Sequence, residues 1–248
     1  MIPSPTESPS ILFQDEHILI LHKPSYMYVH PPEDRIARKS VGRQTCIHWL
    51  TDHHDIYANP IHRLDFSTEG LLIFAKTNQA GSILNQDMRD RKIKKFYNAI
   101  VRGWFKEPIG QIDLPLELDS TGEKVDCLTL YKTLHRIEIP VSVHSKFPTS
   151  RYSWLDIELK TGRWHQIRRH MNRVAHPIIG DREHGDSHHN RYFREQLNIS
   201  RLCLRAVKIE FHHPITAELM SFSCPDSVHW QQIKNVFKNS QFSSASTN

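Results

Sequence analysis

The stretch HRLDFSTEGLLIFAK, residues 62–76, joins a polar turn to a continuous apolar run. Residues 71–75 (LLIFA) have the length of a strand and lie between Gly70 and Lys76, which predicts a buried β-strand. Gly70 permits close approach of another backbone where the strand begins. A rigid strand would hold the carboxylate of Asp65 in place, although an aspartate before a strand is most often a turn or capping residue.

The pattern on either side of this stretch is mostly strand, with a few helices. Alternating or continuous apolar residues predict strands at 96–101, 155–159 and 202–211, and a hairpin whose strands 11–13 and 18–21 are joined by 15–17. Helical spacing and capping residues predict helices at 41–50, from Asn78, from Thr161 through Ala175, and at 228–237. These elements predict an α+β protein built on a mixed, largely antiparallel β-sheet flanked by helices and loops.

The chain's organisation is predicted to be one domain between two tails. Residues 1–9, rich in proline and serine, and the polar residues 239–248 are predicted to be disordered. Residues 10–238 then form a single domain, because no repeat or linker divides them convincingly.

Composition excludes several classes of protein. No apolar run approaches the roughly 20 residues needed to cross a bilayer, and the N-terminus lacks the features of a secretory signal. We therefore expect a cytoplasmic protein, with its four widely separated cysteines reduced. The sequence contains no GxGxxG, P-loop or HExxH motif, so we expect neither a cofactor nor a metal site.

Positive charge is concentrated in three stretches. The formal net charge is only +5, but basic residues gather at 35–43, 89–95 and 163–173. A solvated surface explains any one of these clusters. Three clusters beside the polar motifs favour a nucleic-acid ligand.

Four stretches together resemble the pseudouridine synthases, a large family with an HRLDxxTSGL motif. They are HKPSYMYVH (22–30), HRLDFSTEGLLIFAK (62–76), KKFYNAIVRG (94–103) and LKTGRWHQIRRH (159–170), the last continued by HPIIGDREHG (176–185). The match spans most of residues 11–211 and implies a pseudouridine synthase catalytic domain. The S4 module found in several ribosomal relatives is absent from the sequence. The resemblance is greatest to members that act on transfer RNA, at uridine 65 on the T-stem side of the acceptor arm.

The resemblance implies roles for individual residues. Asp65 would be the catalytic carboxylate, Arg163 its buried positive partner, and Tyr97 a ring stacked on the base, although a core aromatic is the alternative for Tyr97. RNA contacts would come from Arg63, which would enter the stack vacated by a flipped uridine, and from His62. Further candidates, for phosphate contacts, are Lys94, Lys95, Arg168 and Arg169.

Some positions depart from the family pattern. They are Tyr26, Phe66, Glu69 and Arg205, with Arg205 standing where histidine is common. Glu69 adds a second negative charge near Asp65, and we expect its side chain to point toward solvent or a basic cluster.

The predicted function is isomerisation of a tRNA uridine by a protein with no obligate protein partner, as a monomer. Alternatives are a synthase for ribosomal RNA or for both RNA classes, a non-catalytic RNA-binding protein on the same scaffold, and a glycosidase or nucleoside hydrolase.

Overall fold

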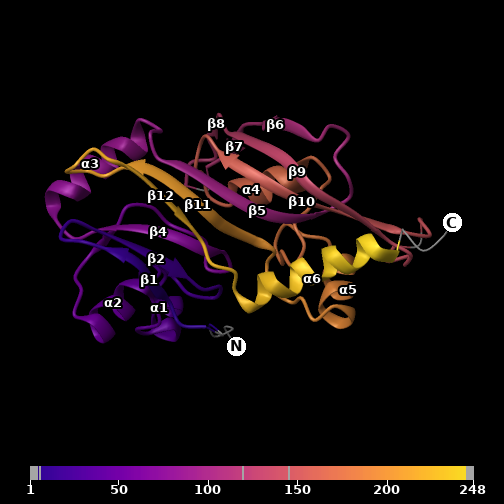
Figure 1. Cartoon of the computed structure of the whole chain (residues 1–248), viewed down its shortest axis with the longest axis horizontal. Helices are drawn as coiled ribbons and strands as arrows, with labels where there is room; N and C mark the ends of the chain where they lie inside the picture. The colour runs from indigo at the N-terminus through magenta and orange to yellow at the C-terminus, as the bar shows by residue number, and fades with distance from the viewer. Residues whose placement is uncertain (1–4, 6, 119, 145, 244–248) are drawn as a thin grey trace. The chain divides into compact units, whose positions relative to one another are not determined.

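The computed structural model describes residues 5, 7–118, 120–144 and 146–243. The chain divides into two compact units, each formed by two separate segments (Figure 1). Unit 1 comprises residues 1–95 and 205–224, and unit 2 comprises residues 96–204 and 225–248. Helices flank mostly antiparallel sheets in each unit, which confirms the predicted α+β class.

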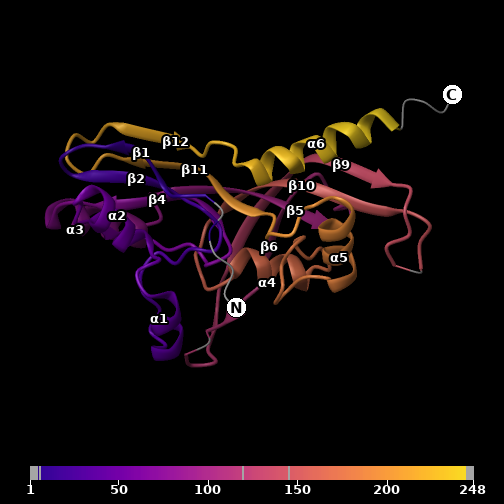
Figure 2. The same ribbon diagram turned by 90° about the horizontal axis from the view of Figure 1, so that it is seen from below.

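Unit 1 is built around a sheet in the strand order β1-β2-β4-β11, with β3 paired to β4 and β12 paired to β11. Figure 2 shows α2 and α3 on the same face of this sheet. The bounds of its elements are β1 Ser10–Gln14, β2 Ile18–Lys23, α1 Arg35–Val41, α2 Cys46–His54, β3 Asn59–Pro60, β4 Glu69–Ala75, α3 Asn78–Arg89, β11 Leu204–His212 and β12 Leu219–Ser223. The predicted hairpin of 11–13 and 18–21 is confirmed as the antiparallel pair β1–β2.

Strand β4 is the centre of unit 1. All seven of its residues are buried, and it pairs antiparallel with β2 and parallel with β11. Gly70 has φ +131°, and a Cβ there would lie 2.3 Å from the carbonyl oxygen of Ala206. The predicted close approach of a second backbone at Gly70 is therefore confirmed, and the approaching strand is β11.

Two helices of unit 1, α2 and α3, begin at threonine caps that were not predicted from the sequence. A single helix over 41–50 is wrong, because α1 ends at Val41 before Gly42 (φ +56°) and α2 starts after Thr45. The Thr45 side chain accepts a hydrogen bond from the backbone N–H of His48 at 3.3 Å. Thr77, rather than Asn78, caps α3 in the same way, through the N–H of Ala80 at 3.2 Å.

Unit 2 contains a sheet in the order β5-β10-β9-β6 and a separate small pair, β7–β8. Its elements are β5 Lys94–Arg102, which begins in unit 1, β6 Ile109–Asp113, β7 Leu116–Glu117, β8 Lys124–Val125, β9 Leu128–Ile139, β10 Ser150–Leu159, α4 Gln166–Arg173, α5 Ser187–Gln196 and α6 Val228–Ser243. Figure 2 shows α6 on one face of this sheet and α4 and α5 on the other. Trp230 of α6 is fully buried and packs against Trp154 of β10, with ring centroids 5.8 Å apart.

Helix ends in unit 2 differ from the predictions at two places. α4 starts at Gln166 rather than after Thr161, because His165 adopts a left-handed conformation (φ 49°) that interrupts a helix. It ends at Arg173, before His176-Pro177 as expected. α6 continues to Ser243, so residues 239–243 of the predicted tail are helical. Of the segments predicted to be disordered, 1–4, 6 and 244–248 lie outside the described residues.

Two general predictions can be checked against the described residues. Across 5, 7–118, 120–144 and 146–243, no helix is both long and apolar enough for a membrane span. All four cysteines are free, in agreement with the predicted reduced state, and all four are also buried.

Candidate active site

Asp65 lies in a tight turn that leads directly into β4. The backbone N–H of Thr68 donates to the carbonyl of Asp65 at 3.1 Å, which closes the turn over residues 65–68. Asp65 itself is half-buried, whereas the strand that follows is buried along its whole length. The turn and the strand therefore hold this carboxylate at the edge of the core of unit 1.

Lys23 stabilises the turn that contains Asp65 through hydrogen bonds to backbone carbonyls. Its side chain is fully buried, and Nζ donates to the carbonyl oxygens of Pro24 at 3.0 Å, Met27 at 2.9 Å and Phe66 at 3.4 Å. The N–H of Tyr26 donates to the same Phe66 carbonyl at 2.8 Å. The motif at 22–30 therefore positions the residue next to Asp65.

The ammonium group of Lys23 also supplies positive charge. Burial lowers the pKa of Lys23 to about 8, against the opposing effects of Cys46 and of the Asp65 and Glu69 carboxylates. At neutral pH the side chain is mostly charged, and its attraction to Asp65 favours the ionised carboxylate. The sequence analysis missed Lys23 as a functional residue. The available signal was a lysine at the end of β2, two positions after its apolar run.

Glu69 was predicted to point toward solvent or a basic cluster, and the first of these alternatives is wrong. Glu69 is 1% exposed, and its register partner on the parallel strand β11 is Arg205, which is 3% exposed. Burying a carboxylate requires a compensating charge, and here a positive residue occupies the paired position. Two departures from the family pattern therefore lie opposite each other.

Lys23, Asp65, Glu69 and Arg205 together form what we call the charge cluster of unit 1. It contains two cationic and two anionic side chains, so it is balanced at neutral pH. Charge balance of this kind lets a carboxylate stay ionised in a partly buried position.

His22 borders the charge cluster. Because it is buried in its neutral form, we expect it to make the protein less stable in acid. It is 6% exposed. Burial, then the positive charges of Lys23 and Arg205, lower its pKa from 6.5 to about 4. Because the unfolded chain binds the proton more readily, the stability from neutral His22 is complete above about pH 6.5. It is lost as the pH falls to about 4, by about 3 kcal/mol in all.

We expect His22→Phe to remove this part of the acid sensitivity. The measurement is the free energy of unfolding in urea at pH 7.5 and at pH 4.5, for the wild type and the variant. His53→Phe, at an exposed position of the same unit, should keep the wild-type pH dependence. An equal loss in the wild type and in His22→Phe would contradict the prediction.

The other sequence-predicted residues of unit 1 differ in exposure. Arg63 and Lys94 are exposed. Lys95 is half-buried, and burial lowers its pKa. Burial followed by the charge of Lys95 lowers the pKa of His62 to about 3, and its Nε2 accepts from the N–H of Ile73 at 3.3 Å. His62 is therefore a neutral ring at physiological pH.

Tyr97 and Arg163 both belong to unit 2, and their exposure differs sharply. Tyr97 lies in β5 and is 6% exposed, which agrees with either predicted role. Arg163 is exposed, which differs from the buried position expected for it. Its backbone is held by Gln166, whose Oε1 accepts from the Arg163 N–H at 3.1 Å and from the Thr161 hydroxyl at 2.8 Å.

Trp164 is a candidate RNA contact that the sequence analysis missed. It follows Arg163 and remains 42% exposed, although its ring stacks on His165 with centroids 3.6 Å apart. The Arg169 guanidinium lies 6.0 Å from the ring centre, and its Nη1 donates to the carbonyl of Glu117 at 3.0 Å. An exposed indole between basic residues is typical of surfaces that stack on bases.

Arg168 occupies a structural position. It is 3% exposed and binds Asp181 through Nε at 2.7 Å and Nη2 at 2.8 Å. Burial raises the pKa of Asp181, but the hydrogen bonds and charge of Arg168 outweigh burial and hold it below its ordinary value. A side chain already engaged in a buried bidentate pair is poorly placed for phosphate, so this geometry speaks against the predicted RNA contact.

One group of side chains has the composition of a metal site. The ligand atoms of His165, Glu183 and His184 lie within 4.8 Å of one another. However, Nδ1 of His165 is 3.1 Å from Nε2 of His184, and its Nε2 is 2.5 Å from Nη1 of Arg168. Burial, then the charge of Arg168, lowers the pKa of His165 to about 3. A hydrogen-bonded network beside a guanidinium disfavours a further cation at this group.

Comparison with known proteins identifies the family. The family model described as RNA pseudouridylate synthase matches residues 17–173, more than half of the chain. The chain belongs to the RNA pseudouridylate synthase family. This RNA pseudouridylate synthase is 38% identical over 238 residues to tRNA pseudouridine synthase C of Vibrio vulnificus (strain CMCP6), covering 92% of this chain and 95% of the relative. It is 36% identical to tRNA pseudouridine synthase C of Haemophilus ducreyi (strain 35000HP / ATCC 700724), with the same coverage of both chains.

Solved structures support the fold of this RNA pseudouridylate synthase. Human RNA Pseudouridylate Synthase Domain Containing 1 superposes with a TM-score of 0.68 at 23% identity, over 91% of this chain and 86% of that chain. Human RNA Pseudouridylate Synthase Domain Containing 4 gives a TM-score of 0.66 at 20% identity, over 92% of both chains. As a member of this family the protein is an isomerase.

Proposed function

We propose that this protein isomerises a uridine of transfer RNA to pseudouridine, at position 65 on the T-stem side of the acceptor arm. The observation that carries the proposal is similarity along nearly the whole chain to proteins named tRNA pseudouridine synthase C. We place the reaction in the cytoplasm, where transfer RNA is matured, and we propose that the protein acts as a monomer.

Asp65 is the proposed catalytic carboxylate. The reaction breaks the N1–C1′ bond of uridine, turns the base over and joins C5 to C1′, so atoms are conserved and neither a redox cofactor nor ATP is required. As in glycoside hydrolysis, an ionised carboxylate stabilises or traps positive charge that develops at C1′. The ammonium of Lys23 supports that ionised state, because it attracts the Asp65 carboxylate from a fully buried position.

Tyr97 and Arg163 complete the proposed catalytic set. Tyr97 would stack on the target base, and its hydroxyl could take part in proton transfer. Arg163 would neutralise the carboxylate, since a guanidinium keeps its proton and can bind a carboxylate bidentately. These two assignments rest on the motifs at 94–103 and 159–170.

RNA binding requires that the target uridine leave its stack. Flipping costs a few kcal/mol and must be offset by contacts that fill the gap. Arg63, exposed next to the catalytic turn, is the proposed filling residue, with His62 beside it. The proposed phosphate contacts are Lys94, Lys95 and Arg169.

Lys94→Ala tests the phosphate contacts. Because each neutralised phosphate releases counterions, we expect weaker tRNA binding and a slope of log affinity against log salt that is smaller by about one. Lys92→Ala is the matched control, since the Lys92 ammonium is already paired with Asp87 at 3.2 Å and Asp90 at 3.1 Å. The measurement is a titration with labelled tRNA at several salt concentrations. Equal slopes of log affinity against log salt for the two variants would show that Lys94 does not contact a phosphate.

The function is tested by tritium release from RNA that carries 5-tritiated uridine. We expect release from unmodified tRNA and none from ribosomal RNA fragments. Release from ribosomal fragments would indicate ribosomal or dual specificity. Binding without release would indicate a non-catalytic RNA-binding protein, and free uracil among the products would indicate a hydrolase.

A further inference from the structure

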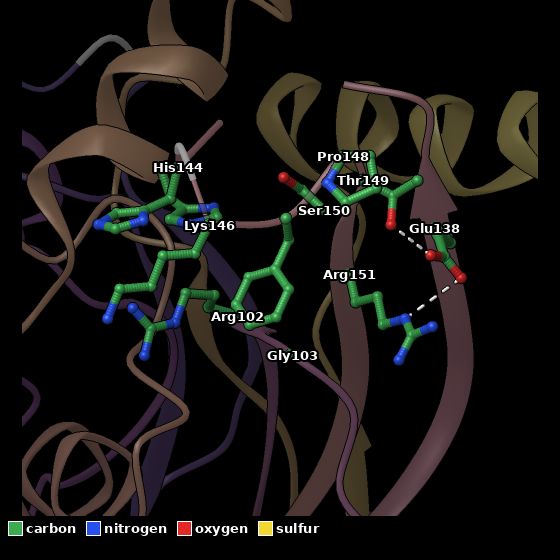
Figure 3. Close-up of a pocket in the computed structure, with 11 residues that line it drawn as sticks. Arg102, Gly103, Glu138, His144, Lys146, Pro148, Thr149, Ser150 and Arg151 are labelled. Atoms are coloured by element: carbon green, nitrogen blue, oxygen red, sulfur yellow. Dashed lines mark hydrogen bonds and ion pairs between the residues drawn. The ribbon is translucent and has the colours of Figure 1, made fainter. Parts of the chain in front are cut away.

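We propose that a pocket in unit 2 binds a phosphorylated nucleotide of the substrate RNA at a distance from the target uridine, an inference that rests on the proposed function. The pocket is a cavity of about 770 Å³ at the ends of β5, β9 and β10. Figure 3 shows Arg102, His144 and Lys146 on one side and Arg151 with Glu138 on the other. Phe147 and His189 also contribute to its lining.

The charge of the pocket is positive. Arg102 is paired with Asp186, and Arg151 is paired with Glu138 at 3.2 Å. These two acidic groups balance the two guanidinium groups. The exposed ammonium of Lys146 adds a further positive charge, which favours an anionic ligand.

Histidines add hydrogen-bonding capacity to this positive pocket. Burial lowers the pKa of His189, so its ring is neutral at physiological pH, and its Nδ1 lies 2.9 Å from the hydroxyl of Tyr152. The ring of His144 meets that of His188 edge-on, with centroids 5.6 Å apart. An imidazole beside a phosphate can donate a hydrogen bond and take up a proton.

Phe147 makes a nucleotide a better ligand than a simple anion. Its ring lines the pocket and is 65% exposed, so its face is open to a stacking base. The guanidinium of Arg151 already lies 4.4 Å from the ring centre of Trp104, beside the same pocket. A cationic group that can hold a phosphate, here Lys146, beside an aromatic ring on which a base can stack is a usual element of single-stranded RNA recognition.

The pocket lies too far along β5 to hold the target base. Tyr97 and Arg102 are both residues of β5, five positions apart, so they are separated by about 17 Å along the strand. The RNA must cover at least this distance, so at about 3.4 Å per phosphate the bound nucleotide would be at least about five positions from the target. A short RNA around the target uridine would therefore leave the pocket empty.

Charge reversal at Lys146 and truncation of Phe147 test the proposal. We expect Lys146→Glu and Phe147→Ala each to weaken binding of full-length unmodified tRNA about 10-fold, since one stacked base contributes about 1–3 kcal/mol. Binding to a hairpin with about three base pairs on either side of the target should be unchanged. Lys106→Glu makes the same charge change at an exposed position of unit 2 outside the pocket, and should weaken tRNA binding less than about two-fold.

The measurements are fluorescence anisotropy titrations with both RNAs, supported by urea unfolding of each variant. Wild-type affinity of Lys146→Glu and Phe147→Ala for full-length tRNA would overturn the proposal. An equal loss of affinity for the hairpin would also overturn it, because the effect would then be general. A titration with adenosine monophosphate distinguishes a nucleotide of the RNA from a free nucleotide. Competition between adenosine monophosphate and tRNA would support an RNA site. Saturable binding of adenosine monophosphate without competition would overturn the proposal in favour of a free nucleotide.

The outcomes separate this proposal from the proposed function. Tritium release from tRNA by the wild type, with pocket variants that bind tRNA normally, would leave the function intact and reject the pocket. Weaker tRNA binding by the variants, with no tritium release by the wild type, would keep the pocket and reject the function.

Discussion

Asp65→Asn abolishes tritium release from 5-tritiated tRNA, with an expected loss of rate of at least about 10⁴-fold, comparable to removal of a catalytic nucleophile. Asparagine has the shape of aspartate but carries no charge, so it can neither attack C1′ nor stabilise positive charge there. The affinity for tRNA should change less than about three-fold, because one rim charge contributes little to a salt-dependent phosphate interface.

The control for Asp65→Asn is the same substitution at an exposed aspartate of unit 1. Asp90→Asn removes a carboxylate that is paired at the surface with Lys92, and it should keep wild-type release. The measurements are single-turnover tritium release and an anisotropy titration. Tritium release by Asp65→Asn at a tenth of the wild-type rate or more would show that Asp65 is not the catalytic carboxylate.

Glu69→Ser should destabilise the protein by about 3–5 kcal/mol, because it leaves a buried guanidinium uncompensated. Arg205 is 3% exposed and is the register partner of Glu69. Lys23 is a second buried cation that interacts with the Glu69 carboxylate. The variant would therefore keep two cations of the charge cluster with only Asp65 to balance them.

The double variant Glu69→Ser/Arg205→His separates compensation from simple loss of a side chain. It restores the residues usual in the family at both positions, and a neutral histidine leaves no unpaired charge. We expect it to recover most of the stability lost in Glu69→Ser, so that the two substitutions are strongly non-additive. Urea unfolding of the two single variants and the double variant measures the coupling. Additive losses would show that the paired positions do not compensate each other.

The elements around β4 were predictable because their signals are local. An uninterrupted apolar run marked β4, and apolar residues on either side of a polar turn marked the β1–β2 hairpin. The helix starts were less predictable, since threonine and asparagine side by side at 77 and 78 are both good caps. The left-handed residue that delays α4, His165, carried no sequence signal, because histidine seldom adopts that conformation.

The site was predictable in its motif and unpredictable in its electrostatics. The turn with Asp65 follows from the segment 62–76 alone. The burial of Glu69 depends on β11, which is distant in sequence and reaches Glu69 only through a parallel pairing. A pattern of residue types reveals neither the register of two such strands nor a lysine like Lys23, whose three acceptors are backbone carbonyls.

The discontinuous make-up of unit 1 has a consequence during synthesis on the ribosome. Its second segment, 205–224, is translated only after the whole of 96–204. At about 5–20 residues per second, β4 waits on the order of 10 s for its neighbour β11. During that interval residues 69 and 70 of β4 lack their parallel partner, and the Glu69 carboxylate has no Arg205 to oppose it. We therefore expect chaperones to bind the incomplete chain. Folding of unit 1 is completed only late in translation.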